Sequence, residues 1–326
     1  MSPTVTSERR DGVTVAAPGS VRPAAAPWER SAGVPLRRSL AGVFTLSLLV
    51  AGLMAGATAV GLRSGAAGVY GADPAVAAGI TASTAGILVP GFFAHDVLNL
   101  AVALPLLLAA VWLAWRGSLA GILLLPGVLF YALYTYAQYL VGAPLGPLFL
   151  AHVLLVVLSA YATICLIAAI DGDAVRSRLE GSVPARAAGG ILVALALLTL
   201  GQDAVGALAT ALAGGAGGSG GAAVEPFARH AWTADLALEV PAVLTGGVLL
   251  WRRRPLGYVV GAGLLLQFGL TPIVLAAIVA LQPWLTGAPA ATGTIAGVLI
   301  FAAVPFAPLA FFVRAATRAG PARGAL

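Results

Sequence analysis

Eight long apolar stretches run through this chain and constrain its fold more than any other feature. A helix needs about 20 apolar residues to cross the hydrocarbon core of a bilayer, so each stretch predicts one transmembrane helix. Hydrophobic residues make up 60% of the chain and charged residues only 9%, too few for a water-facing surface. The sequence therefore predicts an all-α membrane protein whose first partner is the lipid bilayer. The predicted helices lie near residues 39–62, 94–115, 118–140, 147–170, 188–212, 231–251, 255–280 and 290–316.

The arginines indicate the orientation of these helices. All 18 basic residues are arginines, and they gather in short clusters beside the apolar stretches. With the amino terminus inside, 16 of the 18 fall in inner segments, and only Arg63 and Arg229 fall outside. Positive residues concentrate on the cytoplasmic side of membrane proteins. We therefore expect a multi-pass protein of the bacterial cytoplasmic membrane with both termini cytoplasmic. The net charge of +6 is not arranged as one basic face, so no nucleic-acid partner is expected.

An internal repeat is predicted to divide the helices into two sets of four. Positions that align when the sequence is shifted by 136 residues share structural roles: prolines that can kink a helix, Trp-Arg anchors and glycines that allow close packing. The aligned pairs include Asn99 with Asp235, Pro105 with Pro241, Trp115 with Trp251, Gly121 with Gly257 and Gly127 with Gly263. Sets of four helices share one orientation, as in transporters with parallel repeats. The expected order is a disordered cytoplasmic tail, first repeat, cytoplasmic linker, second repeat and tail, at 1–38, 39–170, 171–187, 188–316 and 317–326.

Polar side chains inside the predicted helices are the candidate site residues, because such groups are costly to bury in hydrocarbon. Helical spacing places several of them on common faces. In the predicted topology they all lie in the outer half of the membrane or near its midplane. The candidates for a substrate or ion site are Asp235, Glu239, Asp203, Asp96, Asn99, Tyr131, Gln138 and Gln267.

Structural roles compete with this interpretation. Amide and hydroxyl side chains often join helices through hydrogen bonds. Aromatic side chains at helix ends are common interface anchors, which is the expectation for His230, Tyr136 and Tyr139. Because the chain has no lysine, Asp203, Asp235 and Glu239 are expected to find His, Tyr, Gln or Asn partners, a bound cation or protons.

The sequence predicts no cofactor, although a metal or haem is left open. His95, His152 and His230 all fall at outer helix ends and are weak candidates for metal or haem ligands. No paired histidines stand at a spacing of four, and no phosphate loop or dinucleotide fingerprint occurs. The single cysteine, Cys165, is predicted to be a small buried residue.

Part of the chain resembles a group of uncharacterised bacterial multi-pass membrane proteins. The resemblance covers roughly residues 85–275 and implies membrane location only, with no known activity. It rests on His95-Asp96-Val97-Leu98-Asn99-Leu100, Pro105-Leu106-Leu107-Leu108, Trp115-Arg116-Gly117-Ser118, Tyr131-Ala132-Leu133-Tyr134-Thr135-Tyr136 and Arg252-Arg253-Arg254-Pro255-Leu256-Gly257-Tyr258.

Three functions are compatible with these patterns. The first is a carrier whose polar pocket opens to the outer face and binds a small solute, cation or proton. The second is a redox protein or membrane enzyme that holds a metal, haem or quinone near the histidines. The third is a sensor or assembly protein without catalysis, in which the polar groups only join helices. The oligomeric state is not predicted.

Overall fold

The computed structural model describes residues 36–63, 91–143, 145–215, 228–286 and 291–318. Within them, eight helices are long and apolar enough to cross a membrane, which confirms the predicted all-α architecture of a multi-pass membrane protein. Most of the predicted tails, at 1–35 and 319–326, lie outside the described residues. The eight spans are Ala41–Arg63, Gly91–Trp115, Leu119–Gly142, Phe149–Ala169, Ala185–Leu212, Ala228–Trp251, Pro255–Leu281 and Thr292–Arg318.

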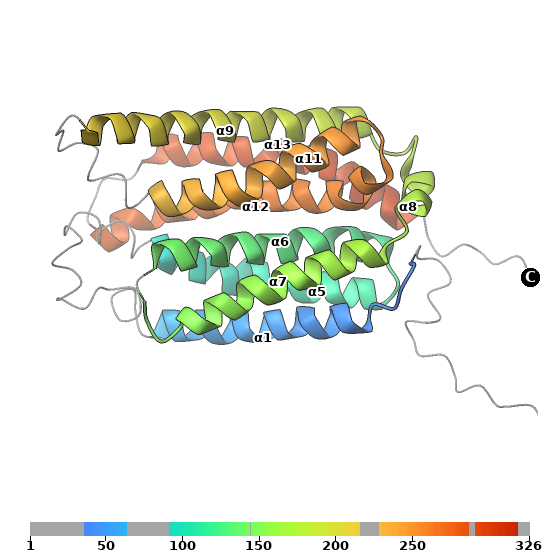
Figure 1. Cartoon of the computed structure of the whole chain (residues 1–326), viewed down its shortest axis with the longest axis horizontal. Helices are drawn as coiled ribbons and strands as arrows, with labels where there is room; N and C mark the ends of the chain where they lie inside the picture. Colours follow the sequence, from blue (N-terminus) through green and yellow to red (C-terminus); the bar gives the residue numbers. More distant parts are fainter. Residues whose placement is uncertain (1–35, 64–90, 144, 216–227, 287–290, 319–326) are drawn as a thin grey trace, which may run out of the picture.

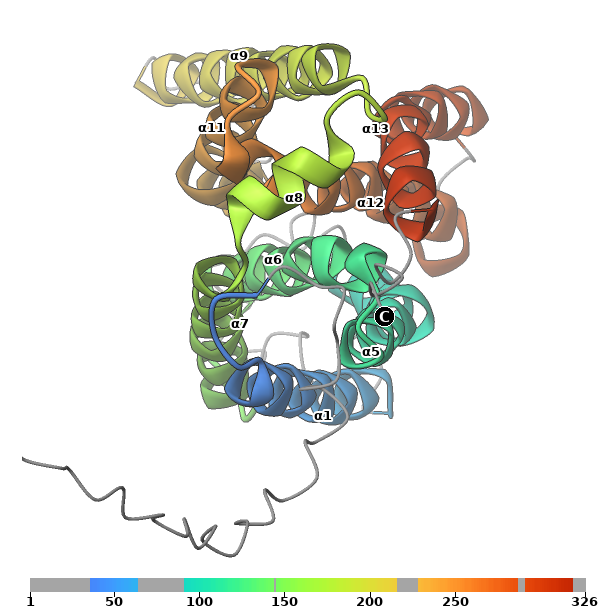
Figure 2. The same cartoon turned by 90° about the vertical axis from the view of Figure 1, so that its right-hand side faces the viewer.

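The long helices run side by side and form two groups of four (Figure 1). Seen end on, each group is a ring of four helices, and the two rings meet where α6 packs against α12 (Figure 2). The first half contains α1 (Ala41–Arg63), α5 (Leu104–Trp115), α6 (Leu119–Gly142) and α7 (Phe149–Ala169). The second half contains α9 (Ala185–Gly215), α11 (Val240–Trp251), α12 (Pro255–Thr286) and α13 (Thr292–Arg318).

A π-helical turn precedes the proline of one helix in each half. The segment η1 spans Asn99–Ala103 and η2 spans Asp235–Glu239, and each is followed by a proline in the first turn of the next α-helix. Proline cannot donate a backbone hydrogen bond and clashes with the carbonyl four residues earlier. The wider turn accommodates this, since Leu104 N–H donates to the Asn99 carbonyl and Val240 N–H to the Asp235 carbonyl. The prolines therefore produce π turns rather than the predicted simple kinks.

Two glycines allow a close approach between the halves. Gly127 of α6 lies against Gly263 of α12, and a Cβ atom added to either would fall on the backbone of the other. Small residues allow such close approach between membrane helices. The two glycines are 136 positions apart, as are the first residues of η1 and η2. The duplication itself stays a prediction.

A short helix, α8 (Gly172–Leu179), connects the halves at one end of the bundle (Figures 1 and 2). We call this end the arginine end, because arginines of the described residues gather there and only Arg63 and Arg229 belong to the opposite helix ends. The helix α8 packs against α12 and α13. It begins at Asp171, whose Oδ1 accepts hydrogen bonds from the backbone N–H groups of Asp173 and Ala174 at 3.1 and 3.3 Å.

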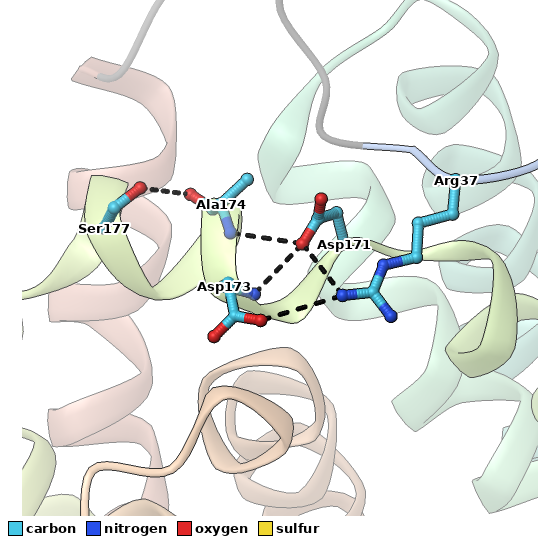
Figure 3. A network of polar contacts seen from close by, with 5 residues as sticks. All are labelled: Arg37, Asp171, Asp173, Ala174 and Ser177. Carbon is cyan, nitrogen blue, oxygen red and sulfur yellow. Dashed lines mark hydrogen bonds and ion pairs between the residues drawn. The ribbon is translucent and has the colours of Figure 1, made fainter.

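The segment before α1 binds to this helix start (Figure 3). The Arg37 guanidinium contacts Asp171 at 3.3 Å and Asp173 at 3.7 Å. The Arg37 backbone N–H donates to the Ala169 carbonyl at 2.8 Å. The start of the first half is therefore joined both to the end of α7 and to the connection that leads into the second half.

The Asp171 contacts predict a pH-dependent contribution to stability. The Ala174 backbone N–H and then Arg37 lower the pKa of Asp171 below its ordinary value of 3.8. A carboxyl group whose pKa is lower in the folded state stabilises the fold above its unfolded pKa, and this is lost as the pH falls through the folded value. We expect Asp171→Ala to lower the thermal unfolding temperature at pH 7, and the difference from wild type to vanish under acid.

Asp171→Asn is the matched control for this prediction, because Asn is an equally good helix cap but carries no charge. It should retain part of the wild-type stability, and this contribution to the unfolding temperature should change little between pH 7 and acid. A deficit of Asp171→Ala that is unchanged in acid would contradict the assigned contacts.

Two sequence predictions about burial are wrong. Cys165 is exposed on the outer surface of α7 instead of buried. Conversely, Tyr136, Tyr139 and His230 are buried inside the bundle, with exposed fractions of 1, 1 and 7%, and do not act as interface anchors. In an apolar helix, the sequence does not distinguish the face toward lipid from the face toward other helices, because both are hydrophobic.

Candidate functional site

Three carboxyl groups form a continuous chain in the second half. The side chain of Asp235 lies within interaction distance of both Asp203 and Glu239. Neighbouring carboxyl groups repel each other when both are ionised, so such an arrangement favours a shared proton. In the described part of the chain, no arginine forms an ion pair with any of the three. These three carboxyl groups, which we call the carboxyl chain, therefore favour a shared proton or a bound cation.

Glu239 lies near the middle of its span. It is the twelfth residue of the 24-residue span Ala228–Trp251, about 16 Å from the start of the span at 1.5 Å per residue. Only 2% of the residue is exposed. Gln267 Nε2 donates to Glu239 Oε1 at 2.5 Å, and the Thr271 hydroxyl donates to the same oxygen at 3.3 Å. Two neutral donors from α12 thus hold this carboxyl group, and they accommodate it either with or without its proton.

Tyr134 connects the carboxyl chain to the first half of the protein. Its hydroxyl on α6 donates to Asp235 Oδ1 on η2 at 2.5 Å. Tyr134 is 3% exposed, so the bond is shielded from solvent and strengthened by the low local dielectric. A change in the charge of Asp235 therefore alters the strength of a hydrogen bond between the halves.

A cavity of about 180 Å³ lies beside this contact. Its wall is made by both halves, from the first turns of the spans at Gly91 and Ala228 and from the facing sides of α6 and α12. Asp235 and Thr271 bring the carboxyl chain to its wall. The polar and aromatic lining side chains are Phe92, His95, Tyr131, Tyr134, Thr135, Gln138, His230, Asp235 and Thr271.

The first half contributes two further polar pairs at the same end of the bundle. The Tyr139 hydroxyl donates to Asp96 Oδ1 at 2.8 Å and to the Phe92 carbonyl at 3.1 Å. The Tyr131 hydroxyl donates to Asn99 Oδ1 at 3.3 Å. Asn99 is fully buried, and its Nδ2 finds no hydrogen-bond partner among the residues that the structure describes. These pairs stand outside the carboxyl chain, so the candidate residues divide between two environments.

The three histidines lie around the neighbouring rings of Phe92 and Tyr139, and two of them also line the cavity. His95 and His230 both line the cavity. His95 Nδ1 lies 2.9 Å from the Gly91 carbonyl oxygen, which can only accept, so Nδ1 carries the hydrogen in this contact. His152 lies instead among the rings of Tyr136 and Tyr139, with centroids at 5.6 and 4.8 Å. Across the described ranges, no group of three or more His, Cys, Asp or Glu side chains is arranged to hold a metal ion.

A larger crevice between the halves, about 520 Å³, is almost entirely apolar. Thr163 and Thr245 are the polar side chains that line it. Ala237 and Leu238 of η2 face this crevice, whereas Asp235 of the same π turn faces the smaller cavity. The π turn therefore separates an apolar space from a polar one, and the ionisable chemistry lies on the polar side.

The structure brings most of the predicted site residues together. Asp203, Asp235 and Glu239 lie next to one another, and Gln267 donates a hydrogen bond to Glu239. Two residues outside the predicted set complete it, Tyr134 and Thr271, which stand at helical spacing from Tyr131 and Gln267 on α6 and α12. Tyr131 and Gln138 line the adjoining cavity, and Asp96 and Asn99 lie in the first half with tyrosine partners.

Comparisons with known proteins give no family for this chain. No protein-family model matches it, and neither a curated protein nor a solved structure matches it. Function must therefore be inferred from the chemistry of the site.

Proposed function

We propose that this protein is a carrier that exchanges protons for a small cationic solute across the membrane. The single observation behind this proposal is the carboxyl chain Asp203–Asp235–Glu239, which meets a cavity lined by both halves. Ionisable residues inside a membrane commonly mark ion pathways and proton relays. Substrate sites of transporters commonly lie near the midplane, where structural halves meet.

The coupling follows from the shared carboxyl groups. With a proton in place, neighbouring carboxyl groups bind each other. When the proton leaves, two negative charges stand side by side, and no ion pair recorded among the described residues offsets them, so this arrangement favours a cation. Proton and solute therefore compete for the same oxygens, and each lowers the affinity for the other by the same factor.

The cavity accommodates a small solute in contact with Asp235. Aromatic rings of Phe92, Tyr131 and Tyr134 contribute to its wall, and ring faces attract organic cations. Tyr134 bonds to Asp235 across the interface, so replacing the proton with a solute alters a contact between the halves. This supplies the differential interaction that an alternating-access cycle needs.

We also infer the orientation from the arginine distribution. The arginine end is proposed to face the cytoplasm of a bacterial cell, with both termini there and the cavity end toward the outer side. A reporter fused near residue 220, between α9 and the span that starts at Ala228, should give an extracytoplasmic signal. A cytoplasmic signal at this position would overturn the orientation.

Proton flux in liposomes tests the carrier function. Purified protein is reconstituted with a pH-sensitive dye inside the vesicles, and alkali cations and small amines are added outside, one at a time. We expect at least one of them to drive protons out of the lumen. Glu239→Gln should abolish this flux, because an amide cannot release a proton.

Asp173→Asn is the matched control, since it also removes a carboxylate but at the exposed start of α8. It should retain wild-type flux. Equal flux in wild type and Glu239→Gln, or the absence of cation-driven flux throughout the panel, would contradict the proposal.

A further inference from the structure

A third cavity, lined by arginines instead of carboxyl groups, lies at the arginine end. It has a volume of about 520 Å³ and is formed between α8 and the last turns of α13. Its lining residues are Arg178, Ser182, Phe311, Arg314, Ala315 and Arg318. Among the described residues no acidic side chain lines it, so three guanidinium groups surround one space without a counter-charge from this part of the chain.

The acidic residues near this cavity are engaged elsewhere. Asp171 and Asp173 contact Arg37, and Glu180 pairs with Arg176 at 3.2 Å. In the part of the chain that the structure describes, no ion pair involves Arg178, Arg314 or Arg318. Arg314 and Arg318 stand four residues apart on one face of α13, a spacing at which like charges repel. An anion in the cavity would offset this repulsion.

The position of the cavity identifies the class of anion. It lies at the ends of membrane-spanning helices, and Phe311, 53% exposed, lies one turn deeper on α13 than Arg314. A ligand bound here therefore meets guanidinium groups at the membrane surface and an aromatic ring on the hydrocarbon side. Basic pockets between membrane helices bind anionic lipid headgroups in this way, and arginine matches phosphate geometry through paired hydrogen bonds.

We propose that Arg178, Arg314 and Arg318 bind the phosphate of an anionic phospholipid, whose acyl chain extends past Phe311. The cavity volume lies within the range of pockets that enclose ligands of drug size, so it admits the glycerol backbone as well as the phosphate. The bound lipid joins α8, the connection between the halves, to α13. This site is independent of the proposed carrier function.

Lipid titration of the full-length, delipidated protein in detergent tests the site. Phosphatidylglycerol, phosphatidylcholine and inorganic phosphate are added in separate series, and bound lipid is counted by native mass spectrometry while thermal unfolding is followed. We expect phosphatidylglycerol to bind and to raise the unfolding temperature, phosphatidylcholine to bind far more weakly, and inorganic phosphate to have little effect. At about 1 kcal/mol for each arginine near an anionic surface, replacing all three by Gln should weaken phosphatidylglycerol binding about a hundredfold.

The control is the double variant Arg252→Gln, Arg254→Gln, which removes charge from the same end but outside the cavity. It should bind phosphatidylglycerol like wild type. The single variant Arg314→Gln changes one exposed side chain and tests the site if the triple variant does not fold. Equal weakening by the control, equal binding of both lipids, or equal stabilisation by inorganic phosphate would overturn the proposal.

Discussion

Replacing Gly127 by Ala should destabilise the protein by about 1–3 kcal/mol, because the new methyl group overpacks the contact between the halves. The Cβ atom would fall on the backbone of Gly263, which cannot move aside by changing a side-chain rotamer. The α6 and α12 helices must separate instead, and the contact that joins the halves weakens. Gly127→Leu should be more severe and prevent recovery of a monodisperse protein in detergent.

Gly56→Ala is the matched control for this effect. Gly56 lies within α1, where an added Cβ meets no atom within 4 Å. Alanine has a higher helix propensity than glycine by about 1 kcal/mol, so this variant should be neutral or slightly stabilised. The two substitutions are chemically identical. We expect Gly127→Ala to lower the unfolding temperature and Gly56→Ala to leave it unchanged or raise it slightly. If Gly127→Ala matched Gly56→Ala, the close α6–α12 contact would be wrong.

The double variant Asp235→Asn, Glu239→Gln should lose the infrared C=O stretching band that marks protonated carboxylic acids in the carboxyl chain. Neighbouring carboxyl groups favour a shared proton. A protonated carboxyl group gives this band, whereas ionised carboxylates absorb elsewhere. Asp235 contacts both Asp203 and Glu239, so Asp235→Asn alone should remove most of the band. The effects of the two single variants should therefore not add, as expected for residues in one network.

Infrared difference spectra between wild type and each variant provide the measurement. Asp171→Asn serves as the control, because the Asp171 carboxyl group accepts hydrogen bonds from backbone N–H groups and Arg37 and is expected to be ionised. An unchanged band in the double variant would show that these carboxyl groups hold no proton. If the double variant lost the band but kept cation-driven proton flux, the carboxyl chain would hold a proton that transport does not use.

The sequence predicted the helices well because length and hydrophobicity are local properties. It also predicted Asp235, Glu239 and Gln267 as site residues, since charges and amides inside apolar stretches need partners. It did not predict that Asp203 of α9 reaches Asp235, or that Tyr134 does so from the other half. Those contacts depend on how each helix is rotated about its axis and which helix stands beside it. The spacing along one helix does not determine either quantity.

The π turns show a different limit. The sequence predicts that Pro105 and Pro241 can kink their helices, but a proline alone does not determine whether the helix bends or widens. The wider turn also sets which residues of the span face the cavity. Asp235 faces the polar cavity while Ala237 and Leu238 face the apolar crevice, an assignment that hydropathy does not supply.

The position of α8 also bears on how the molecule can move. The chain passes from one group of four helices to the other through α8, which lies at the arginine end, whereas the small cavity lies toward the opposite end. Separating the two groups on the cavity side therefore stretches no connection within the chain. The connection at the arginine end can therefore serve as a hinge, about which the two groups of helices open at the polar cavity.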